Sequence, residues 1–285
     1  MESASTAGTA FGCPRNFLSR RLVYTVISSR AHGLSVGVNM NPDKYCNFDC
    51  AYCETNRATA GGSRWLDAVA MSAELKQILM RVQQGRLREL PGYQNLPEEL
   101  LQLRHVALSG YGEPTLCPNF SEVVQTVVRV RASGGFPLFK MVLITNASGL
   151  NLAEVQKGLS FFTARDEVWA KLEAGTQAYM ARVNKPDTAL DSIIANILAL
   201  ARKRPVIIQS LFPKIDGVGP SEEEIQQYAR RLRELKEAGA QIPLVQIYSA
   251  TRPTLHSECG HLSLRALSHI ARCVRQVAGL RAEVF

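Results

Sequence analysis

The chain has 285 residues, 46% of them hydrophobic, which is enough to bury the core of one large domain or two small ones. No apolar run approaches the roughly twenty residues that cross a bilayer, so we expect no membrane association. Lys and Arg outnumber Asp and Glu by 33 to 25, and the net charge of +8 favours nucleic acid, phosphorylated metabolites or an acidic electron donor as partners. The seven cysteines are an odd number and no signal peptide precedes them, which indicates a reducing, cytoplasmic location.

Residues 1–20 are predicted to be a flexible tail, and residues 21–285 a single core domain. The tail combines arginines with Ser and Thr, as an organelle transit peptide does, but its first ten residues carry no Arg and no amphipathic apolar stripe. Cys13 falls in this tail. No Pro-rich or Gly/Ser-rich linker divides the rest of the chain.

From residue 35 onward, short β-branched runs are followed by segments with helical spacing, which indicates repeated β-α units around a parallel sheet. Apolar residues at helical spacing in 120–128 and 190–198 indicate two helices, each with an apolar face that must pack against a sheet. Six strands are predicted, near 35–40, 105–109, 140–146, 167–173, 206–212 and 244–249.

Local signals predict where some helices begin and end. Ser221 and Glu224 have capping-box spacing at the start of one helix, and Gly239 is placed to end it in the left-handed conformation. Pro186 and Asp187 are expected to divide the connection after residue 173 into a short piece and a longer helix.

Three cysteines, Cys46, Cys50 and Cys53, follow the first predicted strand with C-x3-C-x2-C spacing. Thiolates are soft, strongly donating ligands, and such a loop can wrap one face of an iron–sulfur cubane. A four-iron ferredoxin site uses four cysteines, so three leave one iron open to a small molecule. The alternatives are a zinc knuckle, although zinc sites of this length use paired C-x2-C units, or three unrelated core cysteines.

A second motif, Gly110-Tyr111-Gly112-Glu113-Pro114, follows the second predicted strand. Glycines let a backbone approach a ligand closely, and the Glu113 carboxylate offers a negative acceptor to a positive amino group. Taken alone, the segment is equally a strand-to-helix turn.

With Tyr52 as the aromatic residue before Cys53, the cysteine loop resembles that of the radical S-adenosylmethionine (radical SAM) superfamily, and residues 110–114 resemble its Gly-Glu-Pro segment. The run 23–41, expected as one strand, and the stretch 166–175 are similar to a subgroup that includes relatives of the tRNA wybutosine-synthesising enzymes. The resemblance covers roughly residues 20–285. Those enzymes carry further upstream cysteines for a second cluster, where this chain has only Cys13.

The resemblance implies an α/β fold, a partial (β/α)6 TIM-like barrel, with one [4Fe-4S] cluster on the three cysteines and S-adenosylmethionine on the open iron. Glu113 and the nearby main chain would then receive the methionine ammonium group. Reductive cleavage of S-adenosylmethionine would yield a 5′-deoxyadenosyl radical that removes hydrogen from a substrate, so the cofactors carry the difficult chemistry. An electron donor such as flavodoxin or ferredoxin is implied as a partner.

Ligands of such barrels bind at the carboxyl ends of the strands, so polar residues there are site candidates. Glu173 is a candidate for the ribose hydroxyls or else a helix-capping or surface acid, and Lys171 and Arg252 either meet a substrate anion or form internal ion pairs. Asn146 is a ligand contact or a turn former. The full set of cofactor-binding candidates is Tyr52, Gly110, Gly112, Glu113, Pro114, Asn146, Glu173 and Gln209, and the substrate-binding candidates are Lys171, Tyr248 and Arg252.

Three further cysteines, Cys117, Cys259 and Cys273, leave an auxiliary cluster open, although Cys117 and Cys273 fit buried core positions. The leading hypothesis for the substrate is a nucleoside or RNA. One alternative is a radical SAM maturase acting on a peptide or enzyme. Another, of a different class, is a non-catalytic iron–sulfur or zinc protein that senses or scaffolds.

Overall fold

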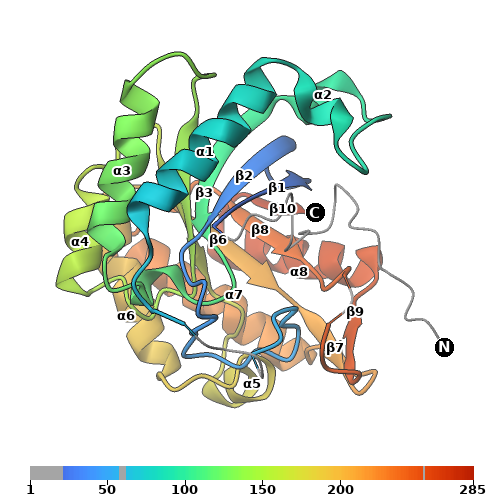
Figure 1. Ribbon diagram of the computed structural model, residues 1–285. Helices are drawn as coiled ribbons and strands as arrows, with labels where there is room; N and C mark the ends of the chain where they lie inside the picture. The colour runs from blue at the N-terminus through green and yellow to red at the C-terminus, as the bar shows by residue number, and fades with distance from the viewer. Residues whose placement is uncertain (1–21, 58–61, 253) are drawn as a thin grey trace.

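The computed structural model describes residues 22–57, 62–252 and 254–285 (Figure 1). The predicted N-terminal tail, with Cys13, lies outside the described residues. Within these three ranges no helix is both long and apolar enough to cross a bilayer.

A curled eight-stranded sheet forms the centre of the molecule (Figure 1). All neighbouring strands are parallel except β1 and β2, which form an antiparallel hairpin. In spatial order the strands are β1 (Val23–Ser28), β2 (Gly33–Asn39), β3 (Leu103–Ser109), β4 (Lys140–Thr145), β5 (Glu167–Lys171), β6 (Val206–Leu211), β8 (Val245–Tyr248) and β10 (Ala282–Val284). The predicted α/β partial barrel is confirmed, and the six predicted strands correspond to β2, β3, β4, β5, β6 and β8.

The prediction of a single strand over residues 23–41 is wrong, because this run folds back on itself between β1 and β2. His32 takes a left-handed φ of 54° and Gly33 a φ of 149°. The turn is closed by hydrogen bonds from the amide of Ala31 to the carbonyl of Ser28 and from His32 to Ser29. The hairpin adds an antiparallel strand to the edge of the parallel sheet.

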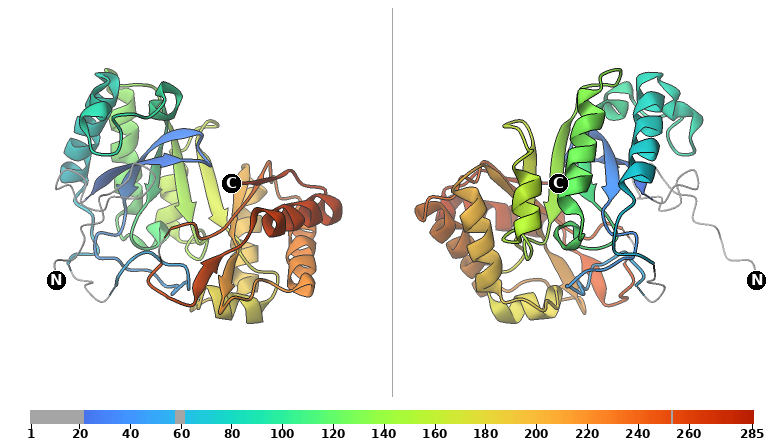
Figure 2. Two further views of the ribbon diagram at one scale, coloured as in Figure 1. Left: turned by 90° about the vertical axis from the view of Figure 1, so that its right-hand side faces the viewer. Right: turned by 60° about the vertical axis from the view of Figure 1, so that its left-hand side comes forward.

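Helices lie on the outside of the curled sheet (Figure 2). Neighbouring helices pack against one another, α1 with α3, α3 with α4, and α7 with α8. The longer helices are α1 (Ala68–Gln83), α3 (Phe120–Ala132), α6 (Leu190–Ala201), α7 (Glu222–Glu237) and α8 (Leu264–Ala278), and α4 (Ala153–Leu159) is a shorter helix that packs against α3. The connections contain α2 (Glu98–Leu101), α5 (Gln177–Val183), the 3-10 turns η2 (Arg86–Glu89) and η3 (Pro114–Leu116), and the antiparallel pair β7 (Pro213–Ile215) and β9 (Cys259–His261).

The predicted helix signals are largely confirmed. The break at Pro186 separates α5 from α6, and Gly239 follows α7 with a φ of 92°. The Ser221 hydroxyl accepts a hydrogen bond from the amide of Glu224 at 3.2 Å. The capping box is incomplete, however, because the Glu224 carboxylate accepts hydrogen bonds from the amide of Gly175 and from the Thr176 hydroxyl instead. This contact ties α7 to the loop after β5.

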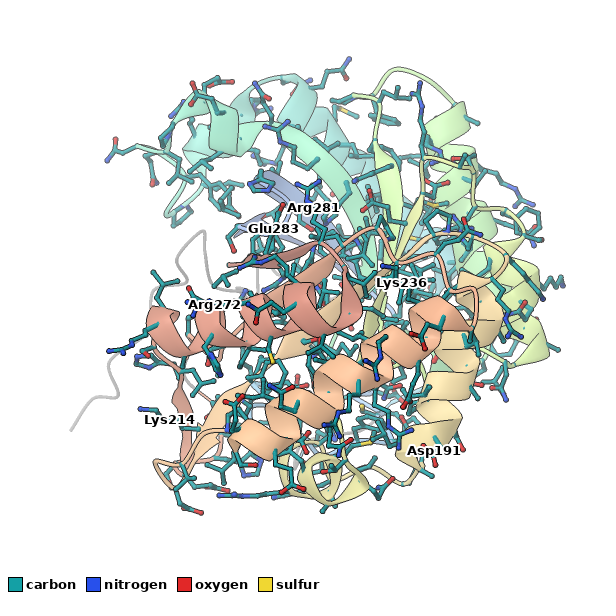
Figure 3. All side chains as sticks on the ribbon, turned by 180° about the vertical axis from the view of Figure 1, so that it is seen from behind. Asp191, Lys214, Lys236, Arg272, Arg281 and Glu283 are labelled. Carbon is teal, nitrogen blue, oxygen red and sulfur yellow. The ribbon has the colours of Figure 1, made fainter. Side chains whose placement is uncertain are left out.

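Charges are dispersed over the back of the molecule, where α7 and α8 lie side by side (Figure 3). Asp191 forms an ion pair with Arg231 at 3.3 Å, and Lys236 donates hydrogen bonds to carbonyl groups at the end of α8. Glu283 pairs with Arg281. On this face Arg231 and Arg281 therefore serve local ion pairs, and Lys236 a helix end.

The turn between β1 and β2 reaches across the open side of the sheet. The Arg30 guanidinium lies over the ring of Tyr248 in β8, 4.1 Å from its centroid. The rings of His32 and Phe285 are 5.9 Å apart. These contacts bring the two edges of the curled sheet together and enclose space on its concave side.

Candidate functional site

The cysteine loop follows β2 at the carboxyl end of the strand, as predicted. Its main chain is held by the end of α5, since the amide of Ala51 donates to the carbonyl of Val183 at 2.8 Å and the amide of Asp49 to that of Asn184 at 3.1 Å. The loop therefore depends on a segment that lies far away in the sequence.

The three cysteine side chains line one cavity of about 180 Å³, together with residues 109–114 and the ends of β4 and β5. Burial raises the pKa of Cys46 to about 12 and that of Cys50 to about 11. Because metal ligands must be deprotonated, these thiols need a nearby positive centre to bind as thiolates. Each sulfur already accepts a hydrogen bond from an N–H group: Cys46 from Phe48 N (3.4 Å), Cys50 from Asn184 Nδ2 (3.5 Å) and Cys53 from Thr55 N (3.4 Å).

In the part of the chain that the structure describes, no three Cys, His, Asp or Glu side chains surround one point closely enough to hold a single metal ion. A cubane cluster has its irons at separate corners, and each cysteine binds a different one. Each of the three cysteines that line this cavity could supply one such ligand.

Gly110 and Gly112 allow the end of β3 to pack against the cysteine loop. A Cβ on Gly112 would lie 1.8 Å from the carbonyl oxygen of Tyr45, which accepts a hydrogen bond from the Glu113 amide at 3.0 Å. Gly110 has a φ of 146°, and a Cβ there would lie 2.3 Å from Oδ1 of Asn39. Both glycines are thus required by contacts within the chain, whereas the sequence suggested approach by a ligand.

The Glu113 carboxylate is 2% exposed and links the turn after β3 to the end of β4. It accepts hydrogen bonds from the Thr115 amide and hydroxyl at 3.1 and 2.6 Å, from the Asn146 amide at 2.7 Å, and from the Thr145 hydroxyl. Burial raises the pKa of Glu113. The Asn146 side chain accepts a hydrogen bond from the amide of Ser148 at 2.9 Å, so Asn146 is a turn former, one of the two predicted roles.

A buried network connects Cys50 to the end of β5. The Tyr52 hydroxyl donates to Glu173, and the Lys171 ammonium lies 3.0 Å from the Tyr52 oxygen and 3.3 Å from Glu173. Asn184 Nδ2 donates to Glu173 at 2.6 Å and also to the sulfur of Cys50. Burial is the largest single effect and alone would lower the pKa of Lys171, but the charges of Glu173, Tyr248 and Cys50 and the hydrogen bond to Glu173 together outweigh it, and the pKa is raised.

These contacts decide two alternatives from the sequence. Glu173 is 4% exposed, so its interpretation as a surface acid is wrong. Lys171 pairs with Glu173, and Arg252 pairs with Glu54 at 3.3 Å, so both cations have internal ion-pair partners.

A second cavity, of about 320 Å³, adjoins the first. Tyr52, Cys53, Gly110 and Lys171 line both cavities. The second cavity is also lined by three predicted residues, Gln209, Tyr248 and Arg252. The amide of Gln209 donates to Gln246 Oε1 at 3.0 Å. The structure thus gathers every predicted site residue around two neighbouring cavities.

Several residues near the site were missed from the sequence. Asn184 reaches the network from the end of α5, and Arg57 Nη2 lies 3.6 Å from the sulfur of Cys53. Arg30 and His105 line the second cavity. No motif marks these positions, because their neighbours in space come from distant parts of the chain.

The remaining cysteines of the described chain lie in separate elements. Cys117 is 2% exposed in the core beside η3, and Cys259 is in β9. Cys273 is 4% exposed on α8 and accepts a hydrogen bond from Gln226 at 3.0 Å.

No model of a known protein family matches the chain. Among curated proteins it is similar to a UPF0026 protein of Helicobacter pylori, with 24% identity over 239 residues that cover 83% of this chain and 70% of the relative. A UPF0026 protein of Methanocaldococcus jannaschii is 26% identical over 218 residues, which cover 75% of this chain and 60% of that protein.

Three solved structures share the architecture. TYW1 with a lysine–pyruvate adduct bound has a TM-score of 0.57 and 13% identity, over 92% of this chain and 86% of its own. Streptococcus suis SuiB bound to the precursor peptide SuiA has a TM-score of 0.61 and 14% identity, over 90% and 49%. A mutant of spore photoproduct lyase has a TM-score of 0.54 and 10% identity, over 93% and 81%. All three have the partial barrel of radical SAM enzymes.

The chain has the radical SAM fold. The resemblance seen in the cysteine loop is confirmed at this level. In this radical SAM fold the three cysteines, the Gly-Glu-Pro turn and the ends of β4 and β5 all lie around one cavity.

Proposed function

We propose that the protein is a radical SAM enzyme that binds one [4Fe-4S] cluster through Cys46, Cys50 and Cys53 and binds S-adenosylmethionine at the open iron. The main support is that the three cysteines follow the carboxyl end of β2 and line one cavity. Each of their sulfurs accepts a hydrogen bond from its own N–H donor. SuiB supports the proposal, since a structure of that protein bound to S-adenosylmethionine has a TM-score of 0.57 to this chain.

Held by Cys46, Cys50 and Cys53 and reduced, such a cluster would supply the electron for reductive cleavage of S-adenosylmethionine, the chemistry that leads to hydrogen abstraction from a substrate. The chain's residues have positioning roles. The N–H donors to sulfur fix the orientation of the ligands, and the positive Arg57 lies beside Cys53. The buried walls exclude water from a reactive intermediate.

The S-adenosylmethionine site is assigned to the first cavity. Tyr52, Glu173 and Asn184 form one rigid wall beside Cys50, and the turn at 110–114 forms another. Because the Glu113 carboxylate already accepts hydrogen bonds within the protein, the main-chain groups of this turn are the better acceptors for the methionine ammonium.

The net charge of +8 supports an acidic one-electron donor such as flavodoxin or ferredoxin. The cytoplasm is the proposed location. The six cysteines within the described ranges are all free thiols, which suits a reducing compartment.

Anaerobic reconstitution with iron and sulfide tests the proposal. We expect iron–sulfur absorbance in wild type, its loss when Cys46, Cys50 and Cys53 are all replaced by Ala, and its retention in the control Cys259→Ala. Addition of dithionite and S-adenosylmethionine should then release 5′-deoxyadenosine. Equal iron binding by the triple variant overturns the cluster assignment. A fully loaded cluster that releases no 5′-deoxyadenosine favours the sensor or scaffold alternative.

A further inference from the structure

The second cavity carries an excess of positive charge that the cluster and S-adenosylmethionine do not use. Three basic side chains and one acidic side chain line it: Arg30, Lys171, Arg252 and Glu54. Lys171 and Arg252 have carboxylate partners. In residues 22–57, 62–252 and 254–285, no carboxylate forms an ion pair with Arg30, so this cation is left for something that enters the cavity.

The geometry of Arg30 leaves its donors available. The central carbon of its guanidinium lies 4.1 Å from the centroid of the Tyr248 ring, a cation–π contact. A guanidinium can bind a carboxylate or phosphate along its planar edge by two parallel hydrogen bonds. The Nε atom is buried and has no hydrogen-bond partner within the described residues. An unpaired buried donor is costly, and an oxyanion in the plane would satisfy it.

The rest of the wall suits the organic body of a small molecule. His105 is 1% exposed, and burial lowers its pKa to about 3. Its ring is therefore neutral near pH 7 and adds no second positive charge beside Arg30. Its Nε2 is 2.8 Å from the Ser35 hydroxyl, while Nδ1 has no partner in the described part of the chain. Trp169 packs edge-on against the His105 ring, with centroids 5.3 Å apart. Neutral polar atoms and aromatic surfaces therefore surround the charged end.

We propose that the second cavity is the substrate site and takes a small molecule with an oxyanionic group, a carboxylate or a phosphate, bound by the edge of Arg30. This inference rests on the proposed function. Tyr52 and Lys171 belong to the wall shared with the first cavity, so a molecule anchored at Arg30 extends toward the cofactor site. A cavity of about 320 Å³ has room for a metabolite-sized molecule.

Intrinsic tryptophan fluorescence can detect binding in the second cavity. It has two tryptophans, of which Trp169 lines the cavity and Trp65 is 59% exposed elsewhere. Trp65→Phe in the full-length, reconstituted protein isolates the buried reporter. Each probe pair tests one anionic group: benzoate is compared with its uncharged amide, benzamide, and uridine 5′-monophosphate with uridine, which lacks the phosphate. Calorimetry measures the same affinities independently.

We expect saturable binding of at least one anion, about tenfold or more tighter than its neutral partner, as one charge-assisted hydrogen bond would give. Arg30→Gln should remove this preference, and Arg30→Lys, which keeps the charge but not the planar fork, should retain part of it. The control is Arg230→Gln on the exposed face of α7, which should change nothing. Circular dichroism and iron content verify that each variant is folded and loaded.

An anion preference in the benzoate pair indicates a carboxylate site, and an anion preference in the uridine 5′-monophosphate pair indicates a phosphate site. Equal affinity for charged and neutral partners overturns the proposal, as does an anion preference that survives in Arg30→Gln. Binding of single-stranded RNA or of a peptide through Arg30, without binding of either small anion, also overturns it. These readouts require no turnover, so anion binding by a protein that releases no 5′-deoxyadenosine would show that only the proposed function had failed.

Discussion

Replacing Asp166 by Asn tests how the amino end of the barrel is held together. The Asp166 carboxylate accepts hydrogen bonds from both terminal nitrogens of Arg131 (2.6 and 3.2 Å), from the amide of Met141 (2.7 Å), and from the amide and hydroxyl of Thr163 (2.7 and 2.9 Å). Asparagine keeps the shape but removes the charge and one acceptor. Arg131, with 15% of its side chain exposed, then loses its counter-charge. Breaking a buried pair in this way costs roughly 3–5 kcal/mol, and we expect about 3 because Arg131 lies near the end of α3.

The effect should depend on pH. Burial alone would raise the pKa of Asp166, but the hydrogen bonds from Arg131 and its other donors outweigh it, and the pKa is lowered from 3.8. A lowered carboxylate pKa contributes stability that is present above the unfolded-state value and is lost as pH falls through the folded-state value. The difference in unfolding free energy between wild type and Asp166→Asn should therefore be largest near neutral pH and shrink below pH 3.8.

Urea unfolding followed by tryptophan fluorescence measures this difference, and Trp169 in β5 is a nearby reporter. A loss of about 3 kcal/mol corresponds to a fall in Tm of roughly 6–12 °C. The control Asp191→Asn removes an ion pair in which Asp191 is 80% exposed, and it should cost less than about 1 kcal/mol. The reasoning is refuted if Asp166→Asn matches this control at pH 7, or if its deficit is the same at acidic pH.

Two further changes probe the site. Gly112→Ala places a Cβ 1.8 Å from the Tyr45 carbonyl oxygen, and we expect a cost of about 1–3 kcal/mol together with reduced iron content after reconstitution. In the control Gly260→Ala the nearest atom is 3.7 Å away, and iron content equal in the two variants would contradict the packing role. Lys171→Met leaves the buried Glu173 carboxylate without its cation and should destabilise the protein by roughly 3–5 kcal/mol in urea unfolding, whereas unchanged stability would show that Asn184 and Tyr52 suffice.

The parallel part of the fold could be predicted because its strands are buried on both faces. Val206, Ile208 and their neighbours in β6 form an apolar run that is bounded by helices with clear stripes. The three-residue strands β7, β9 and β10 are too short to show any periodicity. The β1–β2 turn was missed because residues 29–32 contain no Gly, Pro, Asn or Asp, and only Ser29 and the following Gly33 mark the change of direction.

Some site residues could be predicted by one rule, that residues at the carboxyl ends of parallel strands lie at the same edge of the sheet. Glu173 and Lys171 were found in this way. Asn184 was not, because it reaches the site from the end of a helix. Arg30 was not, because its place over Tyr248 depends on the curvature of the whole sheet. Pairings between side chains more than a hundred positions apart leave no local pattern.

The dependence of the cysteine loop on α5 has a consequence for biosynthesis. A chain made from its amino end delivers Cys50 to the ribosome exit 134 positions before Asn184, whose side chain and main chain help to hold the loop. Until that helix has been translated and has docked, the nascent thiols lack their support. Under the proposed function, cluster binding would therefore wait for α5, and a fragment ending before residue 183 would retain the full cysteine motif without the contacts that hold the loop.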